Sequence, residues 1–117
     1  MTKNETLARW LGYRVELSDT IMPGGKQWTL LTPDGDVIDV HYESEQAAWQ
    51  LLWDRKDFEG KDWEELAGKL LRDGRSVTLF LSGHVAKIQL DSNVCHSYDT
   101  IGLAVSGAVL KLIQEKR

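Results

Sequence analysis

The stretch QWTLLTPDGDVIDVH, residues 27–41, decides the fold class. Residues 27–32 and 36–41 are each rich in the β-branched and large apolar side chains that strands favour. Pro33-Asp34-Gly35 lies between them, where Pro presets φ and Gly accepts a positive φ. The stretch therefore predicts two antiparallel strands joined by a tight hairpin turn.

A helix is predicted directly after this hairpin. Ser44 can cap its N-terminus by accepting a hydrogen bond from a backbone N–H. Trp49 and Trp53 lie four residues apart, which places both rings on one face of a helix. The helix is therefore expected to run from Ser44 to about Trp53.

The remaining segments extend this mixture of strands and helices. Apolar periodicity predicts further helices at about residues 2–11 and 62–72 and from residue 99 or 100 almost to the end of the sequence, and further strands at residues 13–18, 76–82 and 84–91. Asp62 and Glu65 have the spacing of a capping box, and residues 92–97 are expected to form a loop. The order α-β-β-β-α-α-β-β-α predicts an α+β fold: a compact layered α/β sandwich with a mainly antiparallel sheet and about four helices.

Length and composition limit the class of protein. The chain has 117 residues, the size of a single domain, and its formal charge is −4. The acidic balance argues against nucleic-acid binding, which needs a basic surface. One cysteine, Cys95, excludes an intramolecular disulfide and suits a reducing compartment. The longest apolar run, residues 101–110, is about half a membrane span, so we expect a cytoplasmic protein with no membrane partner.

Catalytic and metal-binding motifs are weak. Cys95-His96 with Asp99 offers a nucleophile and a base before a helix N-terminus, but adjacent side chains rarely converge on one point. His84 and His96 lack the spacing of a metal site. Ser106 lies inside a helical pattern, without the glycines of a nucleophile elbow. We therefore expect no enzyme activity, no metal and no cofactor.

The five tryptophans suggest a binding surface instead. Trp10, Trp49 and Trp63 fall on apolar helical stripes and are expected in the core. Trp28 and Trp53 lie beside polar segments, where exposed aromatic side chains near Met and Arg are typical of interface hot spots. The predicted partner-binding residues are Trp28, Trp53, Met22, Lys26 and Arg55.

Three segments resemble one known family. His41–Trp49 (HYESEQAAW), Thr100–Val105 (TIGLAV) and Leu11–Tyr13 (LGY) are similar to segments of the phage ABA sandwich domain family. The resemblance implies a small α-β-α layered fold and a phage or prophage origin. Glu43, Glu45 and the glycines of the last helix depart from the family pattern. The family provides no catalytic residues to carry over.

These observations lead to one functional expectation. The chain is expected to be a non-catalytic phage or prophage accessory protein that binds and inhibits or sequesters a host protein or complex, as a counter-defence inhibitor does. The alternatives are a nucleotide-binding protein using Gly24, Gly25 and Trp28, a structural phage protein, and an enzyme using Cys95 and His96. The apolar last helix also suggests a homodimer.

Overall fold

The computed structural model describes residues 2–19, 25–41, 43–91 and 96–115. The chain divides into two compact units, and each is described by itself. Ala8–Lys56 forms the β1–β3 unit, and Met1–Leu7 with Asp57–Arg117 forms the β4–β6 unit. Helix α1 (Lys3–Leu11) contributes to both units. The single domain expected from the chain length stays a prediction.

Helix α1 begins and ends where its local sequence predicts. The backbone N–H of Glu5 donates to Thr2 Oγ1 at 3.1 Å, which satisfies one donor of the first turn. Gly12 follows the helix with φ of +108°, a conformation that favours glycine over other residues. Leu7 and Ala8 of this helix are completely buried.

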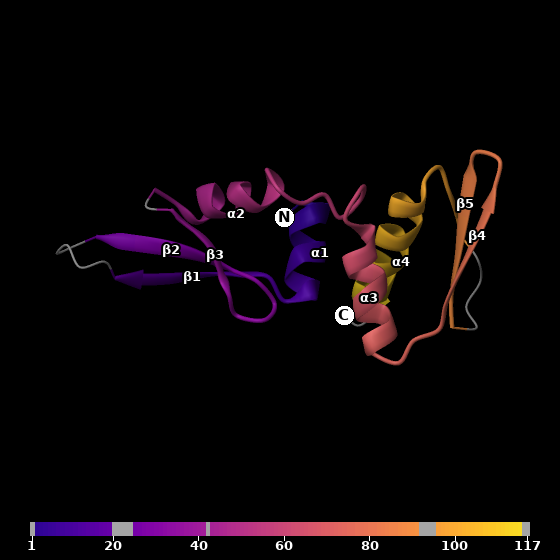
Figure 1. Cartoon of the computed structure of the whole chain (residues 1–117), viewed down its shortest axis with the longest axis horizontal. Coiled ribbons are helices and arrows are strands. Elements are labelled where there is room, and N and C mark those ends of the chain that lie inside the picture. The colour runs from indigo at the N-terminus through magenta and orange to yellow at the C-terminus, as the bar shows by residue number, and fades with distance from the viewer. Residues whose placement is uncertain (1, 20–24, 42, 92–95, 116–117) are drawn as a thin grey trace. The chain divides into compact units, whose positions relative to one another are not determined.

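The β1–β3 unit is a three-stranded antiparallel sheet with one helix along it (Figure 1). The strands are β1 (Arg14–Asp19), β2 (Lys26–Leu31) and β3 (Val37–His41), in the order β1-β2-β3. The predicted turn joins β2 to β3, since the Gly35 N–H donates to the Thr32 carbonyl at 2.9 Å and Gly35 has φ of +91°. The hairpin expected from residues 27–41 is confirmed.

Helix α2 (Glu45–Trp53) packs against all three strands of this unit. Ser44 caps it as predicted, because its hydroxyl accepts a hydrogen bond from the Ala47 N–H at 3.1 Å. The helix buries Ala48, Trp49 and Leu52. With Leu30 and Leu31 of the central strand, these side chains form the apolar core of the β1–β3 unit.

The β4–β6 unit combines a second antiparallel sheet with two helices. Its strands are β4 (Val77–Ser82), β5 (Val85–Leu90) and β6 (His96–Tyr98), in the order β4-β5-β6. Helix α4 (Ile101–Glu115) packs on β5 and β6, and α3 (Trp63–Arg72) packs on α4. Alternation along β5 buries Ala86, Ile88 and Leu90 while leaving Val85 and Lys87 exposed.

Small residues in α4 allow other segments to approach closely. A Cβ atom on Gly102 would collide with the carbonyl oxygen of Glu59, and one on Gly107 would lie 2.6 Å from Tyr98 Oη. Ser106 is buried, and its hydroxyl donates to the Leu103 carbonyl at 3.3 Å. The helix is central to its unit, although Leu103 is 38% exposed.

Over the described residues, the α+β class, the four helices and the predicted order are confirmed, with one added strand. The prediction of a loop over residues 92–97 is wrong at its end, because His96–Tyr98 pairs with β5 as β6. The capping box at Asp62 is also wrong. Helix α3 starts at Trp63 without a hydrogen bond from the Asp62 side chain to its first turn. Asp62 Oδ2 instead accepts a hydrogen bond from the Asp57 N–H at 2.7 Å.

Among the residues that the structure describes, no helix is both long enough and apolar enough to cross a membrane.

Candidate functional site

Trp28, predicted from sequence to bind a partner, lies directly opposite Leu17 in the β1–β2 register. Directly opposed residues of an antiparallel pair share one face of the sheet. Leu17 is 56% exposed, and Trp28 is half-buried. These two side chains therefore form a partly exposed apolar pair, which we name the hairpin patch.

The lengths of the elements explain why this pair is exposed. A six-residue strand is about 20 Å long, whereas a nine-residue helix is about 14 Å long. Helix α2 therefore cannot cover the whole β1–β2 hairpin, and Figure 1 shows the hairpin extending past the N-terminal end of α2. Leu30, further along β2, is completely buried. The apolar face thus runs from the core to the hairpin patch.

Polar groups border the hairpin patch. His41 lies opposite Trp28 on the other side of β2, and its Nδ1 accepts a hydrogen bond from the Glu43 N–H at 3.1 Å. Lys26 is exposed at the start of β2. Met22 and Gly24, which belong to the predicted partner and nucleotide sites, lie outside the described residues. Of the predicted partner-binding residues, Trp28 and Lys26 thus lie on the same strand, β2.

Trp53 and Arg55, the other two predicted residues, lie on α2 and directly after it. The Trp53 ring stacks on Trp49, with ring centroids 5.9 Å apart and an angle of 13° between planes. Trp49 is 1% exposed, whereas Trp53 is only half-buried. The i, i+4 pairing is confirmed, and Trp53 is partly committed to packing within the chain. Trp10 and Trp63 are half-buried too, so only Trp49 belongs fully to the predicted tryptophan core.

Trp49 is also in contact with an ion pair. Arg9 lies over the Trp49 ring, with Cζ 4.8 Å from the centroid. Glu45 Oε1 accepts from both Arg9 Nη2 at 3.3 Å and Trp49 Nε1 at 3.4 Å. These contacts fix the Trp49 ring and, through it, the orientation of Trp53.

Arg55 is engaged with β3. Its Nη2 lies 3.2 Å from Asp39 Oδ2, and its Nη1 donates to the Ile38 carbonyl at 3.5 Å. The guanidinium thus already has partners from the same chain. The predicted residues that the structure describes therefore fall into two groups, Lys26 and Trp28 on β2 and Trp53 and Arg55 at the C-terminal end of α2.

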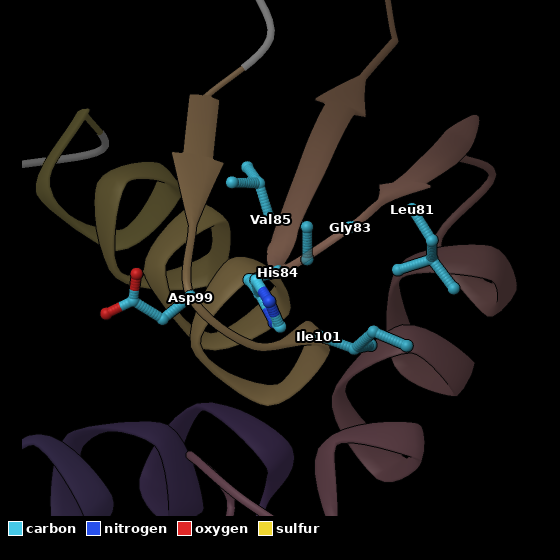
Figure 2. A pocket seen from close by; sticks show the side chains of 7 residues that line it. Leu81, Gly83, His84, Val85, Asp99 and Ile101 are labelled. Carbon is cyan, nitrogen blue, oxygen red and sulfur yellow. The ribbon is translucent and has the colours of Figure 1, made fainter.

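A shallow pocket of about 340 Å³ lies at the β4–β5 turn (Figure 2). Its lining residues come from β4, the turn, β5 and the start of α4: Leu81, Gly83, His84, Val85, Ala86, Asp99 and Ile101. His84 and Asp99 are both exposed, and Figure 2 shows the Asp99 carboxylate directed away from the His84 ring. A general acid–base pair needs hydrogen-bond contact in a site that excludes water, which this pair lacks.

The remaining chemical candidates are placed as follows. Cys95 lies outside the described residues, and the backbone of His96 pairs with Ile88 in β6. The buried hydroxyl of Ser106 is used within α4. Across residues 2–19, 25–41, 43–91 and 96–115, no three His, Cys, Asp or Glu side chains are grouped so that they could hold a metal ion.

In comparisons with known proteins, no family model, curated protein or solved structure matches the chain. The resemblance to the phage ABA sandwich family therefore stays a prediction.

Sequence reasoning missed Leu17, although its signal was present. Val15 and Leu17 are two residues apart on β1 and therefore share a face of the sheet. The residues that lie opposite them could be identified only from the pairing with β2. A strand longer than its covering helix is the feature that marks Leu17 as exposed.

Proposed function

We propose that this chain is a non-catalytic binding protein that recognises a partner protein through the hairpin patch. The observation that supports this proposal is the apolar Leu17–Trp28 pair, which is partly exposed at the end of a sheet whose other end forms a core. Tryptophan is enriched among the few residues that contribute most of the binding energy at an interface.

The backbone of the patch is well suited to binding. Trp28 lies on the central strand, between β1 and β3, and both neighbouring strands hold its backbone by ladder pairing. A side chain presented from a rigid strand loses less conformational freedom on binding than one presented from a loop. Lys26 on the same strand adds a positive charge at the rim, where charges affect association rates and specificity.

The nature of the partner follows from the family resemblance and the charge. A phage or prophage accessory protein meets the proteins of its bacterial host, so the proposed partner is a host protein that is inhibited or sequestered by occupation of its surface. The net charge of −4 favours a partner whose contact region is neutral or basic.

The experiment compares two patch variants with a matched control. Leu17→Ser and Trp28→Ala change the hairpin patch. Leu71→Ser removes a leucine of similar exposure, 60% against 56% for Leu17, from α3. Tagged proteins are used to capture partners from a bacterial lysate, and the affinity of the captured protein is then measured with purified components.

The patch variants are expected to weaken binding by about tenfold or more, since hot-spot truncations commonly exceed about 1.4 kcal/mol. Leu71→Ser should bind as the wild type does, and circular dichroism should show that all three variants are folded. Wild-type affinity in both patch variants would contradict the proposal.

A further inference from the structure

Strand β4 has an unpaired edge. It pairs with β5 on one side and is the outer strand of its sheet. In the described part of the chain, no backbone hydrogen bond reaches the other side of β4. Phe80 is 46% exposed and Leu81 is 66% exposed. The strand therefore presents free N–H and C=O groups together with apolar side chains.

The other sheet edges carry features that block pairing with another chain. Charges on an edge, bulges and very short strands all disfavour such pairing. Strand β1 carries Arg14 and Glu16, and β3 carries Asp39 and a register shift opposite Leu30 and Leu31. Strand β6 is three residues long. Strand β4 (VTLFLS) is six residues long and has no charge, no proline and no register shift.

We propose that β4 pairs antiparallel with β4 of a second copy of this chain. Directly opposed residues in an antiparallel ladder share a face, so the two-fold axis must pass at the level of a residue and not between two residues. An axis at Phe80 places Phe80 opposite its own copy, Thr78 opposite Ser82, and Leu79 opposite Leu81. The two sheets then join into one sheet of six strands.

The absence of charge favours a second copy as the occupant. About a quarter of the chain, 27%, is charged, yet none of the six β4 residues is. A charged side chain near a two-fold axis would meet its own copy, and like charges in opposed positions destabilise a pair of strands. An uncharged strand avoids this repulsion. The pairing also covers Leu81, because Leu79 of the second copy lies beside it.

This inference is independent of the proposed function, because it uses neither Leu17 nor Trp28. Each dimer would carry two hairpin patches, which raises the apparent affinity for any partner that presents two sites.

The test is the mass of the purified protein in solution, measured by light scattering or sedimentation over a range of concentrations. The wild type is expected to shift toward twice the mass of one chain as concentration rises. Phe80→Lys places a positive charge opposite its own copy and is expected to weaken dimerisation at least about tenfold. Thr78→Lys, at another exposed position of β4, places its charge opposite Ser82 of the second copy and should weaken dimerisation less than Phe80→Lys does.

Two control variants distinguish the β4 edge from other surfaces. Val85→Lys adds the same charge to the same face of the sheet, at a residue that is 40% exposed but lies on the inner strand β5. Leu103→Lys changes an exposed leucine of α4. Both should leave the dimer intact. The proposal is overturned if the protein stays monomeric, if the two β4 variants dimerise normally, or if a control variant alone abolishes the dimer.

Hydrogen exchange provides a second readout that needs no substitution. Alternate amides of β4 point away from β5, and these amides should exchange more slowly as the protein concentration rises. Amides of β5 should not change with concentration. Equal exchange of the β4 amides at low and high concentration, in samples where a dimer is present, would place the dimer contact elsewhere.

Discussion

The hydroxyl oxygen of Tyr98 lies 2.6 Å from the position that a Cβ atom on Gly107 would occupy. Tyr98 ends β6 and Gly107 lies midway along α4, so this contact fixes how closely the short strand approaches the helix. Glycine in a helix costs up to about 1 kcal/mol relative to alanine, and here that cost permits close packing.

Gly107→Ala is therefore expected to destabilise the wild type and to stabilise a Tyr98→Ala background. In the wild type, overpacking against the ring costs about 1–3 kcal/mol, which exceeds the gain in helix propensity. Without the ring, only the gain of up to about 1 kcal/mol remains. Urea unfolding of the four proteins measures both effects. The same sign in both backgrounds would contradict the packing explanation.

Two helix caps test whether the chain unfolds as one domain. Ser44 caps α2 in the β1–β3 unit, and Thr100 Oγ1 accepts from the Leu103 N–H at 3.1 Å in the β4–β6 unit. Replacing either residue by alanine should cost about 1 kcal/mol. In a single cooperative domain, as predicted from chain length, Ser44→Ala and Thr100→Ala shift the same calorimetric transition.

Asparagine provides the control for each cap, because it also accepts a hydrogen bond from the first turn. Ser44→Asn and Thr100→Asn should lie within about 0.5 kcal/mol of the wild type. Two separate transitions, each shifted by only one of the alanine variants, would show that the units unfold independently.

The stacked tryptophans are expected to contribute unequally to stability. Trp49 is buried and is also contacted by Arg9 and Glu45, so Trp49→Ala should cost about 3–5 kcal/mol. Trp53 is half-buried, and Trp53→Ala should cost less than half as much. Denaturant unfolding monitored by circular dichroism measures both changes. Similar losses would indicate that Trp53 is a full member of the core.

Asp91 should tolerate asparagine but not alanine. It follows β5 with φ of +56°, which Asn and Asp adopt more readily than Ala. Its Oδ1 accepts from the Ser76 N–H and its Oδ2 from Arg75 Nη1, both at 2.8 Å. Asp91→Ala should cost about 1–3 kcal/mol, because it loses both bonds and adds backbone strain.

Asp91→Asn keeps an acceptor for Ser76 and loses only the partly exposed ion pair, so it should cost less than about 1 kcal/mol. The two variants are compared by urea unfolding. Equal losses would assign the role of Asp91 to its charge and not to its backbone conformation.

Features set by neighbouring residues were predictable from the sequence. The turn at Pro33–Gly35 and the Ser44 cap each depend on one or two residue types with a specific geometric property. The Asp62 cap failed because a nearby group, the Asp57 N–H, takes the same carboxylate. The local sequence identifies Asp62 as a residue that can cap a helix. It does not reveal that a donor outside the helix binds the same carboxylate.

Features set by distant residues were not predictable. Strand β6 has three residues and exists through its pairing with β5. The exposure of Leu17 depends on the β1–β2 register and on the length of α2, and Arg55 is engaged by Asp39, 16 residues away. The sequence identified Trp28 as a residue type suited to binding. Its neighbours could be assigned only after the strands were paired.

Buried and exposed residues alternate along β5, so its two faces tolerate substitution to different degrees. Ala86, Ile88 and Leu90 must keep both size and apolar character, since any slip or polar replacement would open the interior beneath α4. Lys87 points to the opposite side, where many residue types are tolerated. Descendants of this chain should therefore vary rapidly at the outward positions of β5 while the side beneath α4 stays almost unchanged.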